Sequence, residues 1–541
     1  MKVKAPCKDR PFTRYRAIDL WAYLPLAVWT LAALCGVAPA FGAKPRPRVS
    51  ISPPRPLAPP STSRVTSASP LLRWALASDT TGAEIEICAD RACHKVAQRF
   101  RAAGSQGLPP SPLLPGTWFW RLRGQAGEQG GVQVSPTWQF TVGPRSRDVN
   151  RAWGSTLDMN GDGFGDAAIA AIGRRSNAVF VHLGQATGLS PKPVVRLTIA
   201  GHAPAYGQSL ATAGDVNGDG YADLVVGAPT LPNAAYVYHG GAAGPSKKPA
   251  VTLAGGTLSN FGTAVTGAGD VNGDGYADVL VGTDGNVVNV YHGGPAGLSL
   301  TPSTTLTVPD KPGFGRAVAS AGDVNGDGYA DVIIGAPRAD AALVYTGGHD
   351  GLHTDTARIL TGPPHSQFGC AVAGAGDVNG DGYTDVIVGS CGTDQAFVFL
   401  GGVQGLSAAP AFTLPGDGHA TRYVASLGDV NGDGFSDVIV GTLQSARSGA
   451  MSLYLGGPTA LSRPLGVADP GVVSFGPPMI GLGDVNGDGF DDAIAGAAEA
   501  SELFFYKGGA TLGEDDTWDA STQLAGPPDS GFGAAFGGAS Y

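Results

Sequence analysis

A nine-residue pattern, Asp-x-Asn-Gly-Asp-Gly-aromatic-x-Asp, occurs seven times in the chain. Its positions 1, 3, 5 and 9 carry side-chain oxygens, and no His or Cys lies among them. Oxygen ligands alone suit hard cations such as calcium and magnesium, and they do not suit zinc or copper. The aromatic residue at position 7 adds its backbone carbonyl. The metal-ligand candidates are Asp158, Asn160, Asp162, Phe164, Asp166, Asp215, Asn217, Asp219, Tyr221, Asp223, Asp270, Asn272, Asp274, Tyr276, Asp278, Asp323, Asn325, Asp327, Tyr329, Asp331, Asp377, Asn379, Asp381, Tyr383, Asp385, Asp429, Asn431, Asp433, Phe435, Asp437, Asp484, Asn486, Asp488, Phe490 and Asp492.

The ligand set of each copy favours calcium. Three carboxylates, one amide and one carbonyl on a flexible loop suit calcium better than the strict octahedron of magnesium. The spacing of positions 1, 3 and 5 matches the start of an EF-hand loop, but the copies close with Asp at position 9 instead of Glu at position 12. We therefore expect up to seven Ca2+ ions. The alternative is a set of metal-free Asn-Gly-Asp-Gly turns, although turn chemistry does not require three crowded carboxylates.

The spacing of the copies indicates which elements position them. The first Asp residues of successive copies lie 57, 55, 53, 54, 52 and 55 residues apart. A period near fifty residues is typical of a propeller or a solenoid. In the fourth repeat, four short apolar runs are separated by Gly, Pro and Asp clusters, which predicts an antiparallel meander. Four strands per unit is the blade pattern, so we predict an all-β, seven-bladed β-propeller over residues 149–541 with a calcium loop in each blade.

Two further motifs recur around the loops and resemble the FG-GAP repeats of the integrin α-subunit β-propeller. Phe-Gly pairs stand at 261–262, 314–315, 368–369, 475–476 and 532–533, with a Tyr-Gly variant at 206–207, and Gly-Ala-Pro stands at 227–229 and 335–337. The chain departs from the pattern at Val149-Asn150 and at Ala420-Thr421. It also keeps all seven loops complete, whereas integrin propellers carry them on only some blades, and in this it is similar to bacterial secreted versions. The resemblance implies adhesion or ligand binding on the face opposite the calcium loops.

The C-terminal residues 532–541 copy the strand that precedes each loop, but no eighth loop follows. We predict that this strand completes a blade at the ring junction and pairs the two ends of the propeller, because closure removes exposed sheet edges. The alternative is a frayed tail, since residues 149–157 could supply the same strand.

The N-terminal residues 1–40 read as a secretory signal peptide. A basic leader precedes an apolar run from Leu20 to Val37, and Ala38-Pro39-Ala40 offers a cleavage site. We expect a secreted or cell-surface protein with no transmembrane span after cleavage. An uncleaved anchor or a lipoprotein attached through Cys35 are the alternatives. The acidic excess of 45 Asp and Glu over 35 Lys and Arg argues against a nucleic-acid partner, and 21 of the acids are ligand candidates in the loops.

Residues 41–145 differ in character from the repeats. Residues 41–64 are Pro-rich and predict an extended linker. Alternating strand runs over 65–145 predict a small β-sandwich similar to a fibronectin type III domain, whose tryptophans we expect in the core. In an exported protein the four remaining cysteines suggest disulfides. Cys370 and Cys391 flank the fifth loop symmetrically and should face each other across its hairpin; the alternative for these two is a pair of free buried thiols. Cys88 and Cys93 are close enough in the chain to bond across a local turn.

The sequence offers few groups for catalysis outside the loops. His239 and His292 occupy the same place in successive repeats, and residues in register with a repeat are usually structural. No nucleophile elbow or Cys-His pair stands out. We therefore expect a non-enzymatic, calcium-binding adhesion or ligand-binding protein whose partner is an extracellular protein or glycan. The alternatives are a lectin-type propeller and a polysaccharide lyase or hydrolase.

Overall fold

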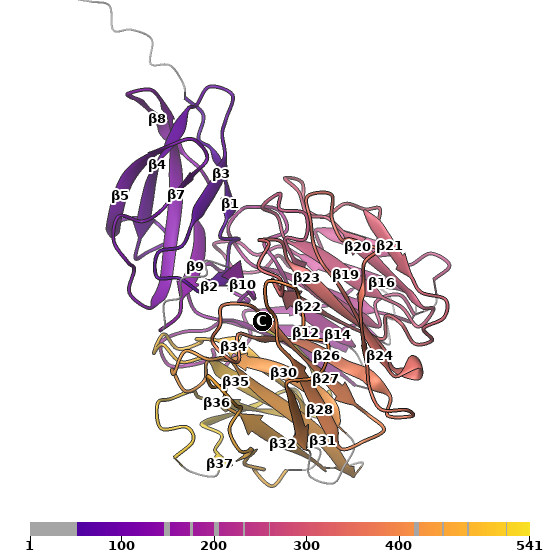
Figure 1. The fold of residues 1–541 in the computed structure, drawn as a ribbon. Coiled ribbons are helices and arrows are strands. Elements are labelled where there is room, and N and C mark those ends of the chain that lie inside the picture. The colour runs from indigo at the N-terminus through magenta and orange to yellow at the C-terminus, as the bar shows by residue number, and fades with distance from the viewer. Residues whose placement is uncertain are drawn as a thin grey trace, which may run out of the picture. The chain divides into compact units, whose positions relative to one another are not determined.

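The computed structural model describes residues 51–144, 152–173, 177–199, 205–230, 233–258, 260–415, 421–445, 448–472, 475–514 and 517–540. Residues 1–50, which include the predicted signal peptide, lie outside this description, as does the Val149-Asn150 pair. Residues 50–541 form one compact unit (Figure 1). In the described ranges no helix has the length and hydrophobicity of a membrane span. The helix found there is the short 3-10 turn η1 (Pro337–Ala339).

Two sheets form the N-terminal domain. One has the order β1-β3-β6, and the other has the order β10-β2-β9-β7-β4-β5 with β8 beside β7. Trp74, Trp120 and Trp138 are buried together between the sheets, as expected of core residues. The strands are β1 (Arg55–Ala58), β2 (Ser63–Val65), β3 (Leu72–Ala75), β4 (Gly82–Cys88), β5 (Val96–Ala103), β6 (Gln106–Gly107), β7 (Gly116–Ala126), β8 (Gln129–Val134), β9 (Trp138–Val142) and β10 (Ala152–Trp153).

This domain begins earlier than the sequence predicts. Residues 55–58 and 63–64, which we assigned to an extended linker, lie in the strands β1 and β2. We took the prolines as evidence against strands. Proline is tolerated on an edge strand, however, because its missing N–H removes no hydrogen bond of the ladder there. β1 is the edge of its sheet and carries Pro56 opposite Trp74.

Seven sheets follow along the described chain, and their strands pair antiparallel except for the parallel pair β33–β37 in the sixth. The first contains β11 (Ala167–Ile172), β12 (Asn177–His182), β13 (Val195–Leu197) and β39 (Phe532–Gly537), and the second contains β14 (Ser209–Gly214), β15 (Asp223–Ala228), β16 (Ala234–Tyr238) and β17 (Val251–Ala254). The third contains β18 (Ala264–Gly269), β19 (Asp278–Gly282), β20 (Val287–Tyr291) and β21 (Thr304–Thr307), and the fourth contains β22 (Ala317–Gly322), β23 (Asp331–Ala336), β24 (Ala341–Tyr345) and β25 (Arg358–Thr361).

The later sheets repeat the same meander. The fifth contains β26 (Phe368–Gly376), β27 (Asp385–Ser390), β28 (Gln395–Phe399) and β29 (Phe412–Pro415). The sixth contains β30 (Thr421–Gly428), β31 (Asp437–Ser445), β32 (Ser448–Tyr454), β33 (Leu465–Val467) and β37 (Thr517–Trp518). The seventh contains β34 (Phe475–Gly483), β35 (Asp492–Ala497), β36 (Glu502–Tyr506) and β38 (Thr522–Ala525).

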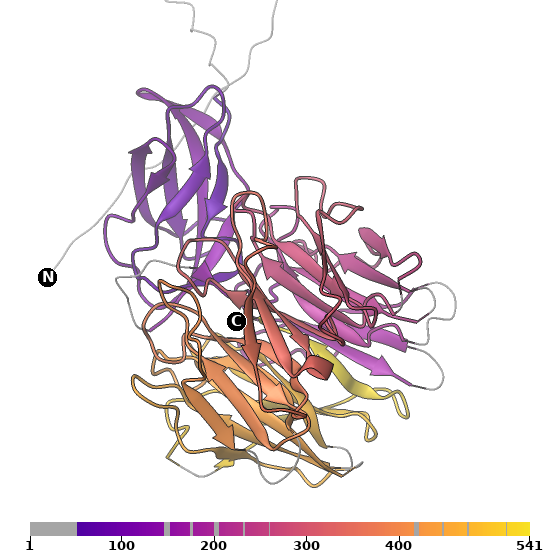
Figure 2. The ribbon, with the colours of Figure 1, turned by 45° about the vertical axis from the view of Figure 1, so that its right-hand side comes forward.

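The sheets close into a β-propeller, which confirms the predicted fold class. The inner strands contact one another in the order β14, β18, β22, β26, β30, β34, and β39 contacts both β34 and β14. β39 pairs antiparallel with β11, with Phe536 opposite Ile169, and a further bridge joins Ser155 to Ser540. Figure 2 shows this yellow C-terminal strand beside the magenta strands of the early repeats. The chain ends therefore close the ring, as predicted, and the tail is not frayed.

The Phe-Gly and Gly-Ala-Pro motifs lie where neighbouring blades pack against each other. In the fourth repeat the N–H of Gly315 donates to the carbonyl of Gly335 within the blade. The carbonyl of Gly315 lies against Gly282 of the preceding blade, 2.2 Å from where a Cβ would stand, so only glycine fits there. Gly315 itself has φ of 90°, a conformation that glycine adopts without steric cost. Phe314 is fully buried and meets Tyr345 edge-on, with ring centroids 6.4 Å apart.

Both predicted disulfides are present. Cys88 and Cys93 are bonded across a tight turn, with Cα atoms 5.1 Å apart. Cys370 and Cys391 are bonded with Cα atoms 6.0 Å apart, and they join the two strands of the hairpin that the fifth loop closes. The second bond lies at the end of the hairpin away from the loop, where it links the residue after Phe368-Gly369 to the residue after β27.

Candidate metal-binding loops

Each of the seven copies forms the same loop, which joins the first and second strands of a blade in the second to seventh copies and leads from β10 into β11 in the first. The carboxylate at position 1 accepts the backbone N–H groups of positions 5 and 6 in every copy. In the second loop, Asp215 accepts from Asp219 at 3.1 Å and from Gly220 at 2.6 Å. The turn around this carboxylate needs the glycine at position 6, since Gly220 has φ of 93°.

The carboxylate at position 9 ties the loop to the rest of its blade. In every copy one oxygen accepts the N–H of position 2. The other oxygen accepts an N–H from the glycine that follows the third strand, such as Gly240 for Asp223 at 2.9 Å. The seven carboxylates at this position are fully buried. The predicted ligands at positions 1 and 9 are therefore brought to the same buried loop in each blade.

Burial makes the charged form of these carboxylates unfavourable. It raises the pKa of Asp215 and of Asp270 to about 7, and repulsion from position 5 of the same loop adds to the rise. It raises the pKa of Asp223 and Asp278 well above the usual range, and the charge at position 1 acts in the same direction. The backbone N–H groups offset only part of this effect. A cation in the loop would remove the cost of these buried charges.

The donor set fits a hard cation in chemical type and burial, but the described conformation does not gather it around one point. Among the described residues no three His, Cys, Asp or Glu side chains lie close enough together to hold a metal. The Asn at position 3 donates to the carboxylate at position 5 in the first six loops, over 2.7–3.1 Å. In the seventh loop Asn486 donates to Asp492 instead. The polar side chains of the loops thus satisfy one another here.

Neighbouring loops are bonded to one another, which the sequence did not reveal. The N–H of position 8 in each loop donates to the carbonyl of position 1 in the loop before, from Ala222 to Asp158 onward, and Gly165 closes the cycle on Asp484. The aromatic ring at position 7 also covers the glycine at position 4 of the preceding loop; the Tyr276 ring lies 2.6 Å from where a Cβ on Gly218 would stand. The signal for this contact was the aromatic residue that occupies position 7 in all seven copies.

The N-terminal domain contacts the first three loops. Arg91 stacks on the Tyr221 ring at 3.9 Å, and Arg55 lies over the Tyr276 ring at 4.7 Å. The Trp138 indole donates to the carbonyl of Gly218 at 3.2 Å. In addition, the Gln139 amide donates to the position 1 carboxylate Asp158 at 2.9 Å. Side chains that the sequence placed in a separate domain thus belong to the surroundings of the loops.

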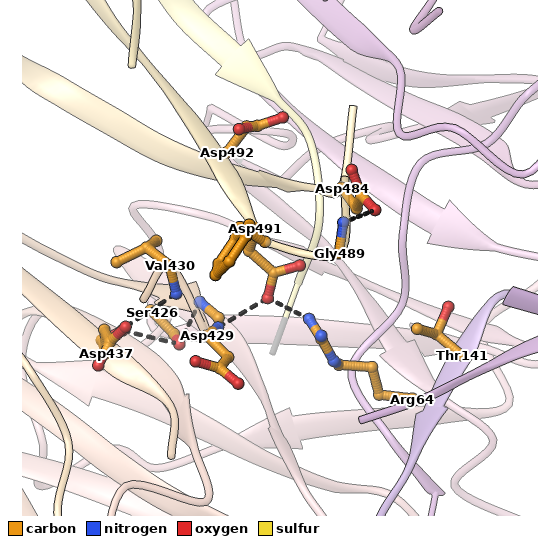
Figure 3. Close-up of polar contacts among 12 residues, drawn as sticks. Arg64, Thr141, Ser426, Asp429, Val430, Asp437, Asp484, Gly489, Asp491 and Asp492 are labelled. Carbon is orange, nitrogen blue, oxygen red and sulfur yellow. Dashed lines mark hydrogen bonds and ion pairs between the residues drawn. The ribbon is translucent and has the colours of Figure 1, made fainter. Parts of the chain in front are cut away.

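A buried ion pair joins the same domain to the seventh loop. Asp491 accepts from the Arg64 guanidinium and also from the backbone N–H of Asp429, 2.7 Å away (Figure 3). The side chain of Asp491 is 2% exposed and that of Arg64 is 12% exposed. Asp491 stands at position 8, where the other loops carry Gly, Ala, Thr or Ser. That break in the repeat was the signal by which the sequence could have revealed this contact.

Comparison with known proteins identifies the repeat. A family model described as FG-GAP-like repeat matches residues 158–226, 215–281, 270–334, 323–388 and 377–440, which together span just over half of the chain. The chain is 31% identical over 220 residues to integrin alpha-5 of Xenopus laevis, covering 36% of this chain and 21% of that protein. It is 36% identical over 159 residues to integrin alpha-IIb of Mus musculus, covering 25% and 15%. The matched part is thus about a fifth or less of these relatives.

Two solved structures described as 6-phosphogluconolactonases align with a large part of the chain. The protein from Bacteroides uniformis has 14% identity and a TM-score of 0.45, over 67% of this chain and 96% of its own. The protein from Bacteroides fragilis has 11% identity and a TM-score of 0.48, over 69% and 97%. Likeness at this level carries no information about activity.

Proposed function

The chain belongs to the FG-GAP-like repeat family, and on this premise we propose that it is an exported, calcium-stabilised propeller that binds a ligand and catalyses no reaction. The observation that carries the proposal is the buried pair of carboxylates at positions 1 and 9 of the first six loops; in the seventh loop the position 9 carboxylate is buried and Asp484 at position 1 is half-buried. Buried charges need a compensating partner, and an all-oxygen set on a flexible loop suits calcium. We propose up to seven ions, one for each loop.

Calcium in this role would stabilise the fold rather than act on a substrate. An ion supplies charge compensation to oxygens at positions 1, 3, 5, 7 and 9, and the loops hold them near the blade hairpins. At ten times its dissociation constant, one ion adds about 1.4 kcal/mol to the free energy of unfolding. Seven such sites in a ring that unfolds cooperatively add roughly 10 kcal/mol at most. The hydrogen bonds between successive loops favour such cooperation.

Export and ligand binding rest on separate observations. Two disulfides are typical of oxidising compartments outside the cytoplasm, and the N-terminal residues have the pattern of a signal peptide. We place the ligand surface on the face opposite the loops, because the N-terminal domain contacts the loops themselves. The absence of catalysis is supported by His239 and His292, which stand in register with the repeat, as structural residues usually do.

The test is a thermal melt of the exported chain, residues 41–541, with calcium, with magnesium and with chelator. We expect a large rise in Tm with calcium, little with magnesium, and reversal on chelation. A Tm that none of the three changes, together with no metal by elemental analysis, would reject the calcium proposal. Screening for lyase and glycosidase activity on acidic polysaccharides tests the claim that the chain is not an enzyme.

A further inference from the structure

The loop face carries a recurrent site for a guanidinium group, and the chain fills it twice with its own arginines. In the second loop, the guanidinium carbon of Arg91 lies over the Tyr221 ring, 3.9 Å from its centroid, and the guanidinium donates to the carbonyl of Gly220. In the third loop, Arg55 lies over the Tyr276 ring, and its Nη1 stands 3.0 Å from the place of a Cβ on Gly275. Both sites combine the aromatic ring of position 7 with the bare glycine of position 6.

The same pair of an aromatic ring and a glycine recurs in the fourth loop, where none of the described arginines lies over the ring. Tyr329 covers Gly273 as Tyr276 covers Gly218, so the two rings have equivalent surroundings. No atom lies within 4 Å of the place of a Cβ on Gly328, whereas guanidinium nitrogens stand 2.8 and 3.0 Å from the equivalent places in the second and third loops. Within the described part of the chain, no cation is found over the Tyr329 ring.

A cavity of about 210 Å3 opens beside this ring. Its charged lining consists of Asp270, Asp323, Asp327 and Arg73, so acidic groups outnumber basic ones. Sites for small organic ligands usually measure about 300–1,000 Å3, and a cavity of this size suits a single side chain better. Asp327 and Gly328 at its rim are exposed, which leaves the site accessible to a partner.

The other open candidate is less suitable. Gly489 of the seventh loop also has free space beside it. There, however, Lys507 already forms an ion pair with Asp488, with the nitrogen 2.9 Å from the carboxylate oxygen. Gly382 of the fifth loop is buried. The fourth loop is thus the described position where ring, open glycine and cavity coincide.

We propose that the fourth loop binds an arginine side chain of another protein, in the manner in which Arg91 and Arg55 bind the second and third loops. Arginine is favoured over lysine because its planar guanidinium can stack on an aromatic face and donate to a carbonyl at the same time. Arg91 does both, whereas Arg55 lies over its ring and its Nη1 finds no hydrogen-bond partner among the described residues. One such contact is too weak to hold a partner alone, so the partner is a protein surface that presents the arginine together with further contacts. The site is additional to the ligand surface proposed for the opposite face, and it does not require calcium in the loop.

The experiment uses the exported chain with calcium present at 150 mM salt, where nonspecific attraction to the acidic propeller is screened. Fluorescent tetra-arginine and tetra-lysine peptides, which carry equal charge, serve as probes in anisotropy titrations. We expect the arginine peptide to bind about fivefold more tightly. Tyr329→Leu should abolish this preference, Tyr329→Phe should retain it because the ring remains, and Tyr383→Leu, the matched change in the fifth loop, should leave it intact.

Equal affinity for the two peptides, or an arginine preference that survives Tyr329→Leu or disappears in Tyr383→Leu, overturns the proposal. Should leucine at position 329 prevent folding, 3-fluorotyrosine incorporated into the otherwise unchanged protein reports on the ring directly. Tyr329→Phe assigns the fluorine resonance by its loss. The signal should move on addition of the arginine peptide and stay in place with the lysine peptide; the absence of any movement with arginine overturns the proposal as well. The calcium melt is independent of these results.

Discussion

Replacing Asp491 with alanine should loosen the N-terminal domain from the propeller. The change is sterically mild, because position 8 is already alanine in the second, third and fourth loops. It removes the acceptor of both Arg64 and the backbone N–H of Asp429. Breaking a buried ion pair costs about 3–5 kcal/mol. Since Arg64 is 12% exposed and can turn toward water, we expect the lower end, a loss of about 3 kcal/mol.

The assay is urea denaturation of wild type, Arg64→Ala, Asp491→Ala and the double variant, at pH 7 with calcium held constant. The double-mutant cycle isolates the pair, and we expect a coupling energy of about 2 kcal/mol. Small-angle scattering of the same variants should show a larger radius of gyration when the pair is broken. A loss below about 0.5 kcal/mol in Asp491→Ala, with no coupling, is what surface changes produce, and it would refute the reasoning from burial.

Three further changes test other parts of the structure. Gly315→Ala should cost about 2–3 kcal/mol, because φ is 90° and the new Cβ would stand 2.8 Å from Val288, whereas Gly285→Ala, whose new Cβ would make only an ordinary contact of 3.5 Å with the Thr283 hydroxyl, should be nearly neutral in the same denaturation assay. Removing the Cys370–Cys391 bond by double alanine substitution should cost about 3 kcal/mol for a loop of this length, and reductant should then no longer lower Tm through this bond. Burial tends to raise the pKa of Glu86, but hydrogen bonding and charge from Arg121, with Arg123 and Arg99, lower it overall. Its contribution is therefore present above pH about 4.5 and is lost as pH falls through the lowered pKa; Glu86→Gln should flatten that part of the stability profile, and an identical profile would contradict the assignment.

The sequence predicted the features that a repeat makes local. The loop residues, the four-strand unit and the closing strand all follow from a motif and its spacing, and the hairpin geometry placed Cys370 opposite Cys391. Each of these depends on residues close in the chain or on a periodicity that is visible along it. The propeller was therefore predictable without knowledge of any long-range contact except closure of the ring.

The contacts between the domains were not predictable in the same way. Arg55, Arg64 and Arg91 are isolated charges in Ser- and Pro-rich or turn segments, and nothing near them in the sequence indicates a partner in the loops. The prolines at residues 56, 59 and 60 led us to predict a linker where the structure has strands, although an edge strand tolerates proline. Asp491 at position 8 of the seventh loop was the exception, because the other loops carry small residues there. An acid that departs from the repeat in this way indicates a specific contact, whereas the sequence around the arginines indicates none.

The charge distribution explains why these arginines and a bound cation need not compete. Residues 152–541 carry 37 Asp and Glu against 14 Lys and Arg, whereas residues 51–144 carry 5 against 9. Even seven divalent ions would leave the propeller acidic, so attraction to the basic domain would persist. The docking contacts use the carbonyls of Gly218 and Gly220, the aromatic rings and Asp491, none of which is a predicted ligand side chain or carbonyl. Gln139, in contrast, donates directly to a ligand candidate, the Asp158 carboxylate. Since the docking contacts and the predicted ligand set use different atoms at the second, third and seventh loops, a bound cation would leave the docking groups of those loops free to make their contacts.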